Sequence, residues 1–218
     1  MKKENKIRLT IAVCCLSAFI LWTTALCLVD VKPIGPQDTA VGFATLNGLF
    51  HNLTGVHMIL YAVTDWLGFV PLGFVMGFAL LGLMQWIKRK HILKVDRSIL
   101  VLGGFYAIVM AVFFLFEILA VNYRPILIEG NLEASYPSST TLLVMCVMPT
   151  AMMQLNARIR NKILRRSVAF LIVAFTIFMV VGRLISGVHW VTDIIGGALL
   201  SAGLVVLYDF FRLKSPLV

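Results

Sequence analysis

The chain has 218 residues, of which 60% are hydrophobic and 13% are charged. A soluble domain is excluded, because its surface would need more charged and polar residues than this composition supplies. The formal net charge of +9 would fit a nucleic-acid-binding protein, but the positions of the basic residues, described below, exclude that class.

Apolar runs long enough to cross a membrane as helices occur six times. They cover about residues 9–29, 57–87, 98–121, 139–155, 167–186 and 189–211. The first run follows Lys and Arg residues, as a signal peptide would, but it lacks a clear small-residue cleavage site, so we expect a retained span. The second run is longer than a straight crossing requires, so we expect residues 57–65 to lie in the membrane interface or in an outer vestibule.

These runs and their short connections fill the chain and leave no room for a second, soluble domain. We therefore predict an all-α polytopic membrane protein. Its fold would be a bundle of six transmembrane helices that forms a single membrane domain over residues 1–218.

Basic residues gather at one end of these runs. All but three of the 19 Lys and Arg residues lie in four clusters. The clusters comprise Lys2, Lys3, Lys6 and Arg8; Lys88, Arg89, Lys90, Lys94 and Arg97; Arg158, Arg160, Lys162, Arg165 and Arg166; and Arg212 with Lys214. If the spans alternate in direction, all four clusters lie on one side, which the positive-inside rule identifies as cytoplasmic. We predict an integral plasma (inner) membrane protein with both termini in the cytoplasm.

Under this topology, residues 30–56, 122–138 and 186–188 face outward. The first segment mixes Pro, Gly and Asn with apolar residues, as an interfacial amphipathic segment or a structural cap over the helix ends would. His51, His57 and Asp65 also face outward. They either line a pocket, where one of them could supply an acid, or are ordinary interfacial polar residues.

The three basic residues outside the clusters are Lys32, Arg124 and Arg183. An arginine kept on the side that the charge bias disfavours serves a bound anion or an internal carboxylate, unless it reaches lipid headgroups. Ser138, Ser139 and Thr140 follow Pro137 at the start of the fourth span, where hydroxyls and free backbone N–H groups suit an oxyanion.

His189 and Asp193 form a second group, together with Arg183. On a helix, residues four apart share a face, so the Asp193 carboxylate can hold the His189 imidazole in one tautomer. Such an imidazole can act as a nucleophile or as a general base, and Arg183 can bind a phosphate nearby. The alternative is a buried pair that only ties helices together.

The order of these motifs resembles the three-part signature of the type-2 phosphatidic acid phosphatase family, Lys-x6-Arg-Pro, Pro-Ser-Gly-His and Ser-Arg-x5-His-x3-Asp. The likeness covers about residues 117–193. It implies metal-independent hydrolysis of a lipid phosphate or diphosphate at the outer membrane face through a phosphohistidine, with no cofactor. His189 would be the nucleophile and Asp193 its partner, while Arg124, Arg183, Ser138 and the N–H groups of Ser139 and Thr140 would bind the phosphoryl oxygens.

Three residues depart from this signature. Glu117 replaces the Lys of the first motif, and would repel phosphate unless it pairs with Arg124 or Arg183 or stays protonated. Gly182 replaces the Ser of the third motif. Thr140 replaces the His that protonates the leaving group in the family, which favours diphosphate substrates, because their leaving group needs less protonation.

Two functions therefore remain open. The first is a lipid phosphate phosphatase or a related phosphotransferase, whose partners are its lipid substrate and the surrounding membrane lipids. The second is a non-catalytic protein of the same fold that binds or moves a lipid phosphate. A transporter of unrelated fold would have Gly- or Pro-broken helices in matching halves, and the sequence lacks that pattern. The sequence leaves open which lipid phosphate is bound and the oligomeric state.

Overall fold

The computed structural model describes residues 2–213, without the side chain of Lys2. Lys214, from the fourth basic cluster, lies outside the described residues. The α-helices are α1 (Lys2–Leu28), α2 (Ala44–Thr54), α3 (Met58–Leu67), α4 (Phe69–Arg89), α5 (Arg97–Leu119), α6 (Ser139–Arg158), α7 (Lys162–Ile185) and α8 (Val191–Leu213). Two short 3-10 turns, η1 (Pro36–Asp38) and η2 (Ile92–Lys94), lie in the connections.

Six helical segments within residues 2–213 are long and apolar enough to cross a membrane. They are α1, the joined pair α3 and α4, α5, α6, α7 and α8. The prediction of an all-α protein with six transmembrane helices is confirmed. Two helices begin earlier than expected. α1 begins at Lys2 and not near residue 9. α7 begins at Lys162 and not near residue 167, because Asn161 accepts hydrogen bonds from the backbone N–H groups of Ile163 and Leu164 and so caps the helix.

α6 and α8 form the centre of the bundle, and about half of each apolar stretch is buried. Their polar side chains face the interior, where Gln154 donates hydrogen bonds to the Tyr208 hydroxyl (2.6 Å) and to the backbone oxygen of Ser98 (3.1 Å). Polar groups inside a membrane must be paired within the protein. The central position of α6 therefore accounts for its being the least apolar of the spans.

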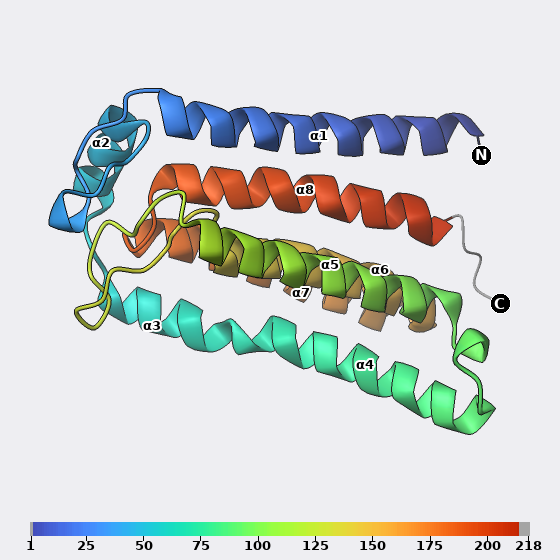
Figure 1. Ribbon diagram of the computed structural model, residues 1–218. Coiled ribbons are helices and arrows are strands. Elements are labelled where there is room, and N and C mark those ends of the chain that lie inside the picture. The colour runs from blue at the N-terminus through green and yellow to red at the C-terminus, as the bar shows by residue number, and fades with distance from the viewer. Residues whose placement is uncertain (1, 214–218) are drawn as a thin grey trace.

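Figure 1 shows the ends of the bundle. The start of α1, the end of α8 and the connection from α4 to α5 lie at one end, and α2 and the connection from α5 to α6 lie at the other. The basic clusters thus share one end, as the alternation of spans requires. The assignment of that end to the cytoplasm stays a prediction.

The first outward segment covers the end of α8. Asn47 of α2 is fully buried and donates hydrogen bonds to the Thr192 hydroxyl (3.0 Å) and to the backbone oxygen of Gly42 (2.8 Å). The backbone N–H of Thr192 donates to the Asn47 side-chain oxygen (3.3 Å). α2 therefore anchors the first turn of α8, in agreement with a structural cap.

The second span diverges from the bundle along α4 (Figure 1). This long span consists of two helices, α3 and α4, which meet at Gly68. α3 packs against the outer end of α7, where the Thr64 methyl group lies against Gly182. This contact brings Tyr61 and Asp65, two residues outside the three sequence motifs, to the place where those motifs meet.

Candidate active site

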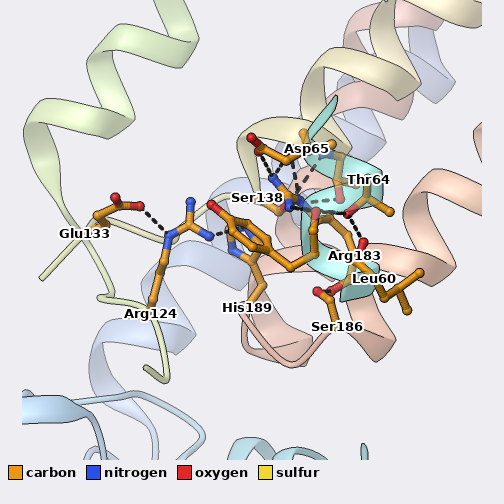
Figure 2. A network of polar contacts seen from close by, with 12 residues as sticks. Leu60, Thr64, Asp65, Arg124, Glu133, Ser138, Arg183, Ser186 and His189 are labelled. Carbon is orange, nitrogen blue, oxygen red and sulfur yellow. Dashed lines mark hydrogen bonds and ion pairs between the residues drawn. The ribbon is translucent and has the colours of Figure 1, made fainter. Parts of the chain in front are cut away.

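The three motifs predicted from the sequence meet at the end of the bundle that lies opposite the start of α1 and the end of α8 (Figure 1, Figure 2). Arg124, Arg183, His189 and Asp193 are all buried, with 8%, 2%, 4% and 0% of their surface exposed. Nη1 of Arg124 lies 3.4 Å from Nε2 of His189. Two guanidinium groups and one imidazole therefore share a largely dry site, in which electrostatic interactions are stronger than in water.

His189 lies in the turn before α8, and only Asp193 lies on the helix, so the prediction that both share a helix face is wrong. Gly187 allows this turn because its φ is +70°, and a Cβ there would stand 1.9 Å from the backbone oxygen of Gly55. The expected pair still forms, with Nδ1 of His189 3.6 Å from Oδ2 of Asp193. The same oxygen accepts a hydrogen bond of 2.9 Å from the backbone N–H of Trp190.

The His189 imidazole is neutral in this environment. Burial, reinforced by the positive charges of Arg124 and Arg183, lowers the pKa of His189 well below its ordinary value, although the backbone of Ser135 opposes the shift. A proton on Nδ1, the nitrogen that faces Asp193, leaves the lone pair of Nε2 directed towards Arg124. An anion held by Arg124 would therefore meet a nucleophilic nitrogen.

Arg183 is held by side chains from two other helices. Its Nε and Nη2 donate hydrogen bonds of 3.0 Å and 2.7 Å to the Thr140 hydroxyl, and Nη2 forms an ion pair of 2.9 Å with Asp65. The Tyr61 ring lies 4.8 Å from the Arg183 guanidinium and 5.9 Å from that of Arg124. The π face of the ring thus attracts both guanidinium groups and offsets part of the repulsion between them.

The acidic partner of Arg124 is Glu133, at 2.9 Å. Glu117, the residue we expected either to pair with an arginine or to stay protonated, is exposed on α5 and forms no ion pair with Arg124 or Arg183 in the structure. It lines a small hollow beside Ser135 and Ser139. The sequence did not single out Glu133, because it lies in a long loop whose path depends on tertiary contacts.

Ser138 caps the start of α6, as predicted. Its hydroxyl accepts hydrogen bonds from the backbone N–H (3.4 Å) and hydroxyl (3.1 Å) of Thr141, and the residue is fully buried. Its oxygen is therefore engaged as a helix cap, and its own hydroxyl hydrogen is free to donate. The backbone N–H groups of Ser139 and Thr140, in the first turn of α6, have no partner within that helix.

Two more residues that the sequence did not indicate, Asn122 and Ser135, lie beside the Asp193 carboxylate. Both are buried. Among the described residues, Nδ2 of Asn122, Oγ of Ser135, Nδ1 of His189 and Oδ1 of Asp193 have no hydrogen-bond partner. Buried polar groups are usually paired, so small movements in the site would complete these contacts. No pattern in the sequence marks Asn122 or Ser135 as belonging to the site.

Gly182, which replaces a Ser of the family signature, has a packing role. A Cβ at this position would lie 2.8 Å from Cγ2 of Thr64. A side chain there would push α3 away from α7 and with it the Asp65 carboxylate that pairs with Arg183. Gly182 therefore lacks the Ser hydroxyl of the signature but allows α3 and α7 to pack closely.

A cavity of about 290 Å³ opens beside the site between α4, α5 and α6. Apolar side chains of these helices form most of its wall, among them Phe69, Val109 and Leu143. Asp65, Ser139 and Thr140 line it as well, and Asp65 and Thr140 also contact Arg183. The cavity therefore joins an apolar space within the membrane region to the charged site.

Among residues 2–213, no group of three or more His, Cys, Asp and Glu residues could hold a metal ion. The absence of a metal and of a cofactor stays a prediction. The chemistry available from the described residues is that of a neutral imidazole, two guanidinium groups and a helix N-terminus, which together suit the binding and attack of a tetrahedral oxyanion.

Comparisons with known proteins bear on the family and the fold of this chain. The family model of the PAP2 superfamily matches residues 119–214. A solved structure described as the first transmembrane PAP2-type phosphatidylglycerolphosphate phosphatase from Bacillus subtilis is similar in fold, with a TM-score of 0.69 and 16% sequence identity, and the match covers 94% of this chain and 98% of that chain. A search of curated proteins gave no match.

We predict that orthovanadate, a tetrahedral mimic of phosphate, raises the melting temperature of the protein in detergent. A ligand at 100 times its dissociation constant stabilises the folded state by about 2.7 kcal/mol. Arg124→Gln should abolish the shift, because it removes one of the two cations at the site. Lys32→Gln should retain it, because Lys32 pairs with Asp30 away from the site. An undiminished shift in Arg124→Gln would contradict the assignment.

Proposed function

Because the PAP2 superfamily model matches residues 119–214 of this chain, we propose that it is a metal-independent lipid phosphatase that cleaves a lipid phosphate or diphosphate at the outer membrane face. The observation that carries this proposal is the neutral, buried imidazole of His189, whose Nε2 faces Arg124 and whose Nδ1 faces Asp193. A phosphate placed between the arginines would lie within reach of that nitrogen.

In the first step, Nε2 of His189 attacks phosphorus and displaces the lipid, which gives a phosphohistidine. Asp193 stabilises the positive imidazole that forms during attack. Arg124 and Arg183 neutralise the phosphoryl oxygens, and the Ser138 hydroxyl with the N–H groups of Ser139 and Thr140 adds hydrogen bonds at the start of α6. In the second step, water releases phosphate and restores the imidazole.

The cavity beside Thr140 supports a lipid substrate. Its apolar wall suits an acyl or prenyl chain, and its polar end adjoins Arg183. A substrate could therefore remain in the membrane while its phosphate occupies the charged site. Burial of the chain would contribute about 0.8 kcal/mol per methylene group.

A second candidate, a non-catalytic protein that binds or moves a lipid phosphate, is favoured by one feature of the site. Each arginine already pairs with a carboxylate, Arg124 with Glu133 and Arg183 with Asp65, and Thr140 offers no strong acid for a leaving group. An incoming phosphate would have to displace or share these partners. Turnover measurements separate the two candidates.

We predict that the purified protein releases inorganic phosphate from at least one member of a panel of lipid phosphates and diphosphates. His189→Ala should abolish release, because no other described group is placed to attack the phosphorus. The panel is assayed in detergent, and equal melting temperatures show that both proteins are folded. A folded wild-type protein that binds the lipids but turns none over would favour the non-catalytic candidate.

We further predict that polyprenyl diphosphate is cleaved faster than phosphatidic acid. Thr140 accepts two hydrogen bonds from Arg183 and supplies no general acid, whose loss typically costs about 10²- to 10⁴-fold in rate. A phosphate monoester leaves with less protonation than an alkoxide does. The two substrates are compared by kcat/KM in the same detergent, and faster cleavage of phosphatidic acid would disprove this preference.

The proposed topology places both termini in the cytoplasm and the site on the outer face. In a background without the four native cysteines, Glu129→Cys lies in the outer loop and Lys90→Cys in the opposite, basic one. A membrane-impermeant maleimide should label residue 129 in intact cells and residue 90 only after lysis. The reverse pattern would show that the orientation is inverted.

A further inference from the structure

Asp65 is the ionisable residue that lines the cavity between α4, α5 and α6; the other residues described as lining it are apolar, Gly, Ser or Thr. Its side chain is 55% exposed. It also forms an ion pair of 2.9 Å with Arg183. It is therefore suited to accept a proton from a molecule that enters this space.

A single nitrogen of Arg183 contacts both Asp65 and Thr140. Nη2 of Arg183 forms an ion pair with Oδ1 of Asp65 at 2.9 Å and donates to the Thr140 hydroxyl at 2.7 Å. The carboxylate and the hydroxyl thus lie together where the cavity meets the charged site. In the view of Figure 2, His189 lies between Glu133 on one side and Asp65 on the other.

The geometry of phosphoryl transfer indicates from which side water would reach the phosphohistidine. The attacking and leaving atoms lie roughly in line through phosphorus. A lipid whose chain occupies the cavity would leave on the cavity side, opposite Nε2 of His189. After the lipid has left, the water that attacks the phosphohistidine must enter from the same side, and so past Asp65.

Other titratable groups nearby are less well placed to accept the proton of that water. Asp193 is fully buried on the Nδ1 side of His189, and Glu133 pairs with Arg124 and does not line the cavity. The His51 ring lies 5.5 Å from the Trp190 ring at an angle of 57°, and His57 contacts the backbone oxygen of Thr54. Asp65 therefore has both access to the entering water and a free carboxylate oxygen.

We propose that Asp65 is the general base of the second half-reaction, an inference that rests on the proposed function. The water oxygen bonds to phosphorus as one water proton moves to the Asp65 carboxylate. The bond between phosphorus and Nε2 of His189 breaks, and its electron pair returns to the imidazole. Inorganic phosphate leaves, and the proton passes from Asp65 to solvent.

The test uses Asp65→Asn, which keeps the size of the side chain and an oxygen that can accept from Arg183 but removes the proton acceptor. Polyprenyl diphosphate labelled with ³²P in its terminal phosphate is mixed rapidly with the detergent-purified protein. We expect a burst of about one polyprenyl phosphate per enzyme, protein-bound ³²P that accumulates, and steady turnover reduced by about 10²- to 10⁴-fold. Hydroxylamine, a nucleophile that needs no base, should restore turnover.

Asp30→Asn is the matched control, because Asp30 is also an ion-paired carboxylate in an outward segment but lies away from the site. It should behave as the wild type does. A slow Asp65→Asn enzyme without a burst and without bound ³²P would overturn the proposal, because Asp65 would then act only by positioning Arg183. Unchanged turnover would overturn it as well.

The same experiment separates this proposal from the function on which it rests. A wild-type protein that releases no product from polyprenyl diphosphate and retains no ³²P contradicts the proposed function, and the base with it. An active wild type whose label is lost in His189→Ala supports the function, whatever the behaviour of Asp65→Asn. The burst, the retained label and the steady turnover of Asp65→Asn decide the role of Asp65.

Discussion

Two buried arginines at one end of a membrane bundle are the constraint on which the rest of the site depends. A guanidinium inside a protein must be paired, and breaking a buried ion pair costs about 3–5 kcal/mol. Arg183 meets this requirement through Asp65 and Thr140, and Arg124 through Glu133. The Tyr61 ring contacts both cations. The second span supplies Asp65 and the loop before α6 supplies Glu133. The pairing of the two arginines therefore constrains the paths of both segments.

Burial, reinforced by the same two charges, determines the state of His189. Because the imidazole is buried beside them, its pKa is lowered and its neutral form is favoured. One arrangement thus accounts for both the proposed nucleophile and the proposed anion-binding site. The pairs with Asp65 and Glu133 also explain how the site remains stable without its anion, since both carboxylates are partly exposed and can yield to a phosphate.

The departures from the family signature are linked to one another in the structure. Gly182 permits the close contact of α3 with α7 that brings Asp65 to Arg183. Thr140, in place of a histidine, receives two hydrogen bonds from the same arginine. The Asp65 carboxylate and the Thr140 hydroxyl thus both contact the Arg183 guanidinium. The family signature has a histidine at the position of Thr140. The proposed role of Asp65 as a general base rests on this arrangement.

The sequence by itself determined the membrane character, the six spans within the described residues and the chain segments that form the site, because hydropathy, basic clusters and spaced motifs are local properties. The order Arg124, Ser138, Arg183 and His189 was sufficient to indicate an oxyanion site. Only the tertiary structure decided that Glu133 and Asp65, and not Glu117, pair with the arginines. It also decided that His189 lies in a turn before α8. Such pairings depend on loop paths and helix packing between residues far apart in the chain, which no local pattern encodes.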